Sequence, residues 1–201
     1  MVAPQKVKRR TLKDIENYVS PDKILLMIKE GRAWPYKTRK EFYKKRDRAL
    51  LVTLYLTASR ISETLLLKKD QFNFSDPEFV VVEDFKILKR KKKTLQKEGR
   101  PMVNIPFPKV GVLKPFTEMV LDYLPFSSNR LFPFTRHRAH QLVKYQTGMW
   151  PHYFRSQRLS QVINLIKNPD AVGKMFGIKS TNTLTHYYKT SWEEHKNAFL
   201  Q

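Results

Sequence analysis

The chain has 201 residues, and its 39 Lys and Arg against 18 Asp and Glu give a formal net charge of +21 at pH 7. A positive excess of this size predicts a polyanionic partner, and nucleic acid is the first candidate. The sequence contains no cysteine, which excludes disulfide bonds, thiolate metal sites and cysteine nucleophiles.

Composition and hydropathy predict one compact domain without a membrane span. The hydrophobic share of 41% and the 13 Phe supply a buried core for a chain of this length. No apolar run approaches the roughly 20 residues of a spanning helix, and no signal peptide precedes the first charged residues. We therefore expect an intracellular, cytoplasmic protein associated with DNA and not with a membrane; an anionic membrane surface is the rival partner.

The N-terminal part of the chain predicts a basic arm followed by two helices. Residues 1–10 are rich in Lys and Arg without an apolar period, so they are either a solvated arm or an arm that grips backbone phosphates. Ser-Pro-Asp at 20–22 is typical of a helix start, and Gly31 is typical of its end. Apolar residues at helical spacing between Lys37 and Ala58 predict a second helix with one buried face.

A short polar box follows this second helix. Arg60 lies in the run Ser-Arg-Ile-Ser-Glu at 59–63, and the leucines after it predict another helical segment that extends to Asp70. Taken alone, one arginine between two apolar helices is usually a surface residue.

The middle of the chain predicts a hairpin with a basic tip. Residues 79–82 and 85–88 are strand-like, and residues 102–106 give a return strand that a proline ends. The connecting stretch 89–100 carries one acid among many bases, so its charges repel one another unless phosphates are near. The stretch is either a DNA contact, or a solvated charge run or localisation-type signal.

Helices are also predicted in the C-terminal half. Apolar spacing and the Pro, Gly and Asn at the ends give the ranges 115–124, 136–145, 151 to the break at 168, and 171–176, and Ser-Thr-Asn at 180–182 predicts the cap of a further helix. His137 and His140 have no nearby carboxylate and are interpreted as part of a basic helix face. None of the five histidines shows the spacing of a helical zinc site, so we expect no metal.

His152 and Arg155 are three residues apart just after Pro151, which is a good first-turn residue. Both side chains therefore stand on one side of a helical turn and can reach one phosphate. Tyr187 downstream and Arg60 upstream complete a set of side chains able to cut a phosphodiester without a metal.

Taken together, these stretches resemble the catalytic domain of the tyrosine recombinases, the phage and archaeal integrases. The matching motifs are the box at 60–63, the basic hairpin that ends in Ile-Pro at 105–106, His152-x-x-Arg155, and Tyr187. The resemblance implies an α+β, mainly α-helical fold with a small antiparallel sheet of about three strands. Ser-Gln-Arg after Arg155 is more like the archaeal and archaeal-virus branch than the bacterial form.

The resemblance implies a site-specific DNA recombinase, an integrase that cleaves and rejoins strands through a covalent 3′-phosphotyrosine intermediate without metal, ATP or cofactor. Arg60 and Arg155 would clamp the nonbridging oxygens, because guanidinium groups bind them bidentately where charge develops. His152 would take or relay the proton of Tyr187, and Lys91 would protonate the departing 5′ oxygen.

Two tyrosines compete for the role of nucleophile. The family places it nine residues after a His or Trp that follows a glycine; counting from Ile178 after Gly177 gives Tyr187, with Tyr188 as the alternative. Ile178 departs from the pattern, since it cannot donate a hydrogen bond to the phosphate. The site then either works less well or recruits Lys179 or another donor.

The catalytic lysine is not fixed by spacing alone. The strand period of residues 85–87 projects Lys91 from the same face of the hairpin, but Lys89 and Lys93 share that parity. Glu63 matches a family acid that we expect to support the basic site rather than to act as a base. Outside the catalytic set, the cations that we expect at DNA are Lys89, Arg90, Lys92, Lys93, Arg158 and Lys179.

The resemblance also sets expectations for organisation and partners. Residues 1–201 are expected to form a single catalytic domain, because the residues before 38 are too few for the N-terminal core-binding domain of family members. The tail 189–201 carries a narrow apolar stripe, which favours tail exchange and a homo-tetramer on double-stranded DNA. The alternatives are type IB topoisomerase-like strand relaxation by a monomer, and a non-catalytic DNA-binding protein that retains the fold, for which Ile178 is the reason.

Overall fold

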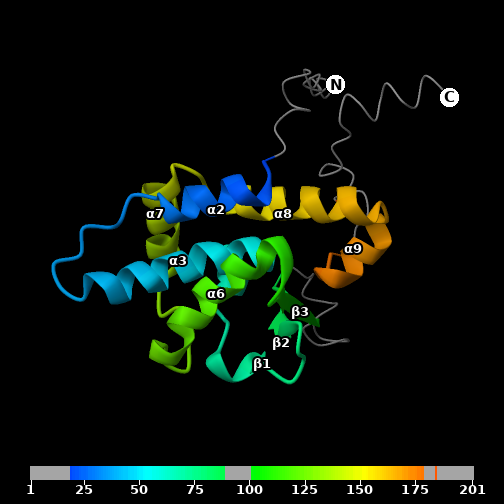
Figure 1. Cartoon of the computed structure of the whole chain (residues 1–201), viewed down its shortest axis with the longest axis horizontal. Helices are drawn as coiled ribbons and strands as arrows, with labels where there is room; N and C mark the ends of the chain where they lie inside the picture. The colour runs from blue at the N-terminus through cyan, green and yellow to red at the C-terminus, as the bar shows by residue number, and fades with distance from the viewer. Residues whose placement is uncertain (1–18, 89–100, 179–183, 185–201) are drawn as a thin grey trace, which may run out of the picture.

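Helix α3 (Lys40–Leu56) lies at the centre of the computed structural model, which describes residues 19–88, 101–178 and 184. Helices α2 (Pro21–Lys29) and α8 (Pro151–Ile166) lie above α3 in the view of Figure 1, and α6 (Lys114–Tyr123) lies below it. The second half of α3 is therefore buried on every side, from Ala49 onwards. The prediction of a single buried face is wrong here, because packing between two layers demands apolar residues all round.

The two N-terminal helices begin and end for local reasons. The Ser20 hydroxyl accepts a hydrogen bond from the Lys23 backbone N–H (3.4 Å) at the start of α2, which ends before Gly31 as predicted. Helix α3 begins three residues later than predicted, because Arg39 has a left-handed backbone with φ of 48°.

Beyond α3 the chain makes only one turn of helix, α4 (Ile61–Thr64), and a 3₁₀ turn, η1 (Lys69–Gln71). The predicted helix to Asp70 is wrong. The backbone here pairs with a distant segment instead: the Leu131 N–H donates to the Leu67 carbonyl (2.9 Å), and the Lys69 N–H donates to the Asn129 carbonyl (3.0 Å).

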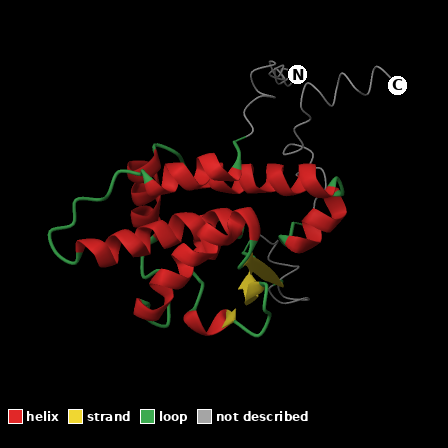
Figure 2. Cartoon of the chain, in the orientation of Figure 1, coloured by secondary structure: helices red, strands yellow, loops and turns green. Residues whose placement is uncertain are grey.

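A three-stranded antiparallel sheet in the order β1-β2-β3 forms one edge of the described molecule (Figure 2). Its strands are β1 (Phe72–Asn73), β2 (Phe79–Lys86) and β3 (Met102–Pro108). Asp84 has φ of 52° at a register shift in β2, which joins the two predicted strand segments into one bulged strand. Pro106 does not end its strand as predicted; it pairs with Val81, and β3 tolerates it as an edge strand.

The C-terminal helices follow the prediction closely. Helix α7 (Arg136–Thr147) starts at a Thr135 cap that accepts from the Arg138 N–H (3.2 Å), and it ends at Gly148 with φ of 71°. After α8, helix α9 (Pro169–Met175) begins at Asn168, whose side chain accepts from the Ala171 N–H.

The end of α9 packs against the hairpin strands at a glycine. Gly177 has φ of 63°, and a Cβ at this position would lie 2.7 Å from Ile87 Cγ1. A small second core joins α8 and α9, and Leu184 is completely buried in it. Gly177 therefore lies against the hairpin, while the next residue, Ile178, packs against the second core.

The predicted class, a mainly α-helical α+β fold with about three antiparallel strands, is confirmed. None of the described helices has the length and apolar character needed to cross a membrane. The basic arm 1–10, the cap at 180–182 and the tail 189–201 lie outside the described residues, as does the hairpin tip 89–100.

Candidate active site

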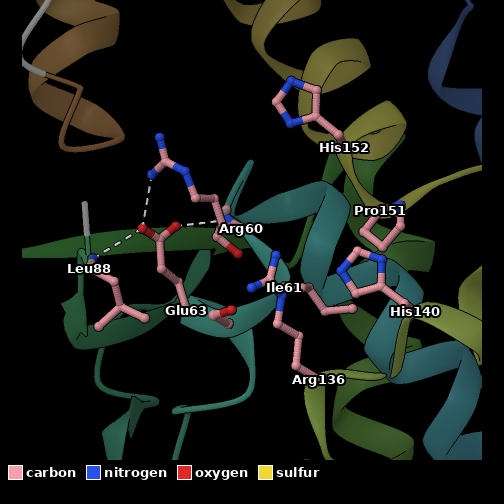
Figure 3. Close-up of a pocket in the computed structure, with 10 residues that line it drawn as sticks. Arg60, Ile61, Glu63, Leu88, Arg136, His140, Pro151 and His152 are labelled. Carbon is pink, nitrogen blue, oxygen red and sulfur yellow. Dashed lines mark hydrogen bonds and ion pairs between the residues drawn. The ribbon is translucent and has the colours of Figure 1, made fainter. Parts of the chain in front are cut away.

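A pocket of about 390 Å³ opens where four elements distant in sequence meet (Figure 3). It is lined by residues 59–63 around the start of α4, by Leu88 just after β2, by Arg136 and His140 of α7, and by Pro151 and His152 of α8. The fold therefore brings Arg60 and His152 to one cavity although 92 positions separate them in the sequence (152 − 60).

Arg60 is held at this pocket by a buried carboxylate. The Glu63 side chain, 1% exposed, accepts hydrogen bonds from the Arg60 backbone N–H (2.7 Å) and from the Arg60 guanidinium (3.0 Å). It also accepts from the backbone N–H of Leu88 (3.1 Å), as the dashed lines in Figure 3 show. Glu63 thus joins α4 to the end of β2 and orients Arg60, whose side chain is 39% exposed.

The turn before Arg60 is fixed from behind by Arg155. Ala58 has a left-handed backbone with φ of 45°, and its carbonyl accepts a hydrogen bond from the Arg155 guanidinium. Ser59 is also tied down, since its hydroxyl accepts from Thr57 Oγ1 (2.8 Å). Arg155 is only 4% exposed and does not line the pocket, so the contact that the structure describes for it stabilises the Arg60 turn.

His152 stands at the start of α8, one residue after Pro151 in the first helical turn. The residue is exposed and lines the pocket. Partial desolvation of the ring lowers the pKa of His152 below its ordinary value of 6.5, and the charges of Arg155 and Arg60 lower it further. The imidazole is therefore neutral at neutral pH and is able to accept a proton.

Helix α7 contributes two pocket residues that the sequence analysis did not assign to the site, although it named His140 as part of a basic helix face. Arg136 and His140 are one turn apart, and both line the cavity. The pKa of His140 is lowered by partial burial, and then by the charges of Arg136 and His137. The available signal was the Thr135 cap, which fixes where α7 begins and therefore places residues four apart on one face.

Arg158 and Ile178 are described by the structure but do not line the pocket. Arg158 is partly exposed, with its guanidinium carbon 5.8 Å from the centre of the Tyr55 ring. Ile178 packs against the second core, and its backbone N–H donates to the Gly173 carbonyl (2.7 Å). The other predicted site residues lie outside the described residues: Lys89, Arg90, Lys91, Lys92, Lys93, Lys179, Tyr187 and Tyr188.

Within the described part of the chain, no three His, Asp or Glu side chains are grouped so that they could hold a metal ion. The pocket instead gathers guanidinium and imidazole groups, and its one acid, Glu63, already accepts three N–H groups. Chemically, such a cavity is suited to bind an anion and to move a proton.

Residues 35–194 of the chain match the model of the phage integrase family. Among curated proteins, none matches the sequence. Solved structures do resemble it: XerH site-specific recombinase bound to difH substrate has a TM-score of 0.60 at 15% identity, and XerA recombinase has 0.57 at 15%. The Tn1549 transposon integrase (residues 82–397) in complex with circular intermediate DNA has a TM-score of 0.53 at 14% identity.

The structural matches cover most of this chain but less of the other proteins. They include 89% of this chain and 51% of XerH, 92% and 64% for XerA, and 96% and 66% for the Tn1549 integrase. The chain therefore spans about half the length of XerH. At these identities the likeness concerns the fold, and it confirms the predicted recombinase catalytic-domain architecture.

Proposed function

Because this chain belongs to the phage integrase family, we propose that it cuts and rejoins DNA strands through a covalent 3′-phosphotyrosine intermediate. The observation that carries the proposal is the pocket in which Glu63 presents Arg60 beside His152. A phosphodiester repels nucleophiles because it is negative, and its charge grows on the oxygens during attack. An oriented guanidinium lowers both barriers.

The proposed reaction needs no group beyond side chains and DNA. The phenolic oxygen of Tyr187 attacks phosphorus, the bond from phosphorus to the 5′ oxygen breaks, and the strand stays attached to the protein through its 3′ phosphate. His152 takes the phenolic proton, and Lys91 gives a proton to the departing 5′ oxygen. Rejoining runs these steps backwards, since a free 5′ hydroxyl attacks the phosphotyrosine and releases the tyrosine.

The lowered pKa of His152 supports its role as the proton acceptor. A tyrosine of ordinary pKa near 10 stays protonated at neutral pH and gains nucleophilicity when a neutral base removes its proton during attack. Arg155 supports the same chemistry from its buried position, because it fixes the turn that carries Arg60.

We also propose double-stranded DNA as the partner and four copies of the chain as the active assembly. The net charge of +21 favours a phosphate backbone, the Tn1549 integrase structure is a complex with DNA, and the XerH structure is bound to difH substrate. The tail 189–201 is the proposed segment of exchange between copies. An origin in the archaeal or archaeal-virus branch stays a prediction.

The proposal is tested by covalent trapping on a pool of randomised, nicked duplexes, in which a cleaved strand loses its short end and cannot be rejoined. Wild-type protein is expected to form complexes that survive denaturation, and sequencing their junctions would define the target site. Tyr187→Phe should give none, while Tyr188→Phe should trap normally. The reverse result would move the nucleophile to Tyr188, and an adduct on another residue type would refute a tyrosine mechanism.

A second candidate, a DNA-binding protein without catalysis, is favoured by Ile178. This side chain is apolar, and its position is the one that usually supplies a hydrogen-bond donor to the phosphate. Under this alternative, the wild type binds the pool as tightly as Tyr187→Phe does, and neither protein is trapped. Type IB topoisomerase-like relaxation is separated by supercoiled plasmid: a topoisomerase relaxes it as a monomer, whereas a recombinase needs the assembled complex on its site.

A further inference from the structure

We propose that Arg136 and His140 form a second phosphate-binding wall of the pocket, which holds the DNA phosphate next to the one that is cleaved. That the second phosphate is the neighbour of a cleaved one rests on the proposed function. That this wall binds a backbone phosphate rests on the α7 side chains alone, and the two claims are tested separately.

The geometry of α7 places both side chains on the cavity. The Thr135 cap sets the start of the helix, so Arg136 occupies its first position and His140 stands one turn later on the same face. Both line the pocket with Arg60 and His152. In Figure 3 the Arg136 guanidinium and the His140 ring lie on the side of the pocket away from the Arg60 guanidinium.

One ring nitrogen of His140 has an unused hydrogen-bonding capacity that a ligand would satisfy. Its Nε2 is buried and has no hydrogen-bond partner among the described residues. A buried polar atom without a partner costs free energy, so such atoms in folded proteins call for an explanation. A phosphate oxygen would supply the partner once the ring turns slightly toward the cavity, because the nitrogen is covered in the free protein.

The charge of this wall matches an anion. Arg136 is exposed, and no ion pair to it is found in the described part of the chain. The pKa of His140 is lowered by partial burial, Arg136 and His137, so the ring is neutral near pH 7 and offers one N–H donor. Arg136 therefore supplies the charge and His140 a directed hydrogen bond.

The size of the cavity also leaves room for more than one phosphate. Its volume of about 390 Å³ falls in the range of pockets that hold whole small molecules, roughly 300–1,000 Å³. The cleaved phosphate belongs to the side that carries Arg60 and His152. The remaining wall then meets the next part of the same strand, where the repeating anionic group is the neighbouring phosphate.

Holding two successive phosphates would fix the strand along its axis and thereby align the cleaved phosphorus for in-line attack. Arg136 and His140 would then contact the substrate but exchange no proton with it. Their loss should lower the rate of cleavage through misplacement, since a shift of about 1 Å at the reacting centre costs roughly a hundredfold in rate.

The first test measures binding and does not depend on cleavage. Affinity for a random 30-base-pair duplex is titrated against salt for wild type, Arg136→Gln, His140→Gln and the control His137→Gln, which lies on the same turn but does not line the pocket. Each lost phosphate contact should lower the slope of log K against log salt by about 0.9. We expect this loss for Arg136→Gln, weaker binding with an unchanged slope for His140→Gln because its ring is neutral, and neither effect for His137→Gln. Equal slopes for Arg136→Gln and His137→Gln would overturn the proposal.

The second test uses the nicked duplex recovered by trapping, made with an uncharged methylphosphonate on either side of the cleaved phosphate. At one of the two positions the wild type should be trapped about tenfold more slowly. The Arg136→Gln/His140→Gln double variant should be slow on both DNAs and lose nothing further. Equal losses for wild type and double variant would refute the contact. Absence of trapping by wild type on unmodified DNA would refute the proposed function. The salt titration alone would then decide whether Arg136 and His140 bind a phosphate.

Discussion

Glu63 is the buried group on which the exposed arginine of the pocket depends. Its carboxylate accepts three N–H groups, two from Arg60 and one from Leu88, while the residue itself is 1% exposed. The carboxylate therefore acts as a structural acceptor, which is the supporting role expected from the sequence. Among the described residues that line the pocket there is no other acid, so no second carboxylate of the lining offsets the charge of Arg136.

Replacing Glu63 with Ala should cost about 2 kcal/mol of unfolding free energy, because two partly buried backbone N–H groups, those of Leu88 and Arg60, lose their acceptor. The Arg60 ion pair adds little to this figure, since that side chain is 39% exposed. Urea denaturation provides the measurement, with Glu118→Ala as control because its pair with Lys114 is exposed on both sides. Equal denaturation midpoints for the two variants would show that the hydrogen bonds accepted by Glu63 contribute no stability.

The pH dependence of trapping follows from His152. Since its pKa lies below 6.5 in the free protein, the base is neutral above that pH and becomes protonated as the pH falls through the lowered value. Trapping at subsaturating DNA reports the free protein, so its rate should hold steady above about pH 6.5 and decline at lower pH. His152→Gln should be slow and should lose this acid limb. An acid limb unchanged in the variant would assign it to another group.

At the scale of residues, the sequence predicted which side chains lie close together in the fold, but it did not predict the role of each one. The separation of His152 and Arg155 and the box around Arg60 were sufficient to predict that two of these side chains approach one site. Spacing could not reveal that Arg155 contacts the Ala58 carbonyl, because this depends on a left-handed residue at the end of α3. The pocket role of His140 was hidden because the approach of α7 to α4 is a tertiary event.

At the scale of elements, α7 is held in place by a buried polar network at its far end. Asp47 of α3 is completely buried and accepts hydrogen bonds from the Tyr36 hydroxyl (2.7 Å), from Arg46 (3.0 Å) and from Gln146 of α7 (3.3 Å). Burial, together with the hydrogen bond to Asp47, raises the pKa of Tyr36 to about 12, so its phenol stays a donor. The network fixes α7 against α3, and α7 in turn presents Arg136 to the pocket.

The contact between α9 and the hairpin predicts a steep cost for Gly177→Ala. The substitution meets two penalties, a backbone at φ of 63° and a Cβ at 2.7 Å from Ile87 Cγ1. Gly148→Ala is the matched control, since its φ is 71° but nothing lies within 4 Å of the added Cβ. We expect about 1 kcal/mol for Gly148→Ala and about 2 kcal/mol more for Gly177→Ala.

Thermal or urea unfolding of the two glycine variants gives the comparison directly. Adding Ile87→Ala to Gly177→Ala should recover part of the loss attributable to the clash, so the two changes together should cost less than their sum. If the two glycine variants lost the same unfolding free energy, Ile87 would have to move away from the added Cβ without any energetic cost.

Helices and strands could be predicted where residues close together in the sequence determine them. Helices α2 and α7 begin at the expected places, after the caps Ser20 and Thr135, whereas α9 begins two residues before its predicted start; the strands were found from their apolar content. The predicted helix to Asp70 failed because pairing with residues 129–131 overrides local propensity. A pairing partner some 60 positions away leaves no trace in the spacing of leucines.

At the scale of the molecule, the fold class was predicted from the resemblance to the tyrosine recombinases, together with the helix and strand patterns, but the burial of α3 was not. A helix whose first half is charged and whose second half is apolar on every side can be placed only when both neighbouring layers are known. The cations of this same helix lie in its N-terminal half, away from Arg60, which follows its C-terminal end. Lys40, Lys44 and Lys45 of its N-terminal half lie about 16 to 24 Å along the axis from Leu56 at the Arg60 end, from the rise of about 1.5 Å per residue.

Because of this separation, two variants can distinguish the effect of total net charge on DNA binding from the effect of lysines at particular positions. One variant replaces four lysines of the hairpin tip by glutamine, and its partner replaces four lysines at the distant end of α3, so both lose the same charge of four. The first set is Lys89, Lys91, Lys92 and Lys93, and the second is Lys37, Lys40, Lys44 and Lys45. If the tip contacts phosphates as proposed, the first variant should lower the slope of log K against log salt by about 0.9 for each contact removed.

The distant set should change that slope little, because exposed charges farther than about 10 Å from a phosphate are screened at 0.1 M salt. The measurement is a salt titration of binding to several duplexes of different sequence, on which the tip variant should weaken binding uniformly, since phosphates carry no sequence information. Equal slopes for the two variants would mean that the +21 charge acts as a diffuse field. In that case Lys91 of the basic tip would not be the proton donor to the leaving 5′ oxygen. A cation of the pocket itself would have to supply that proton.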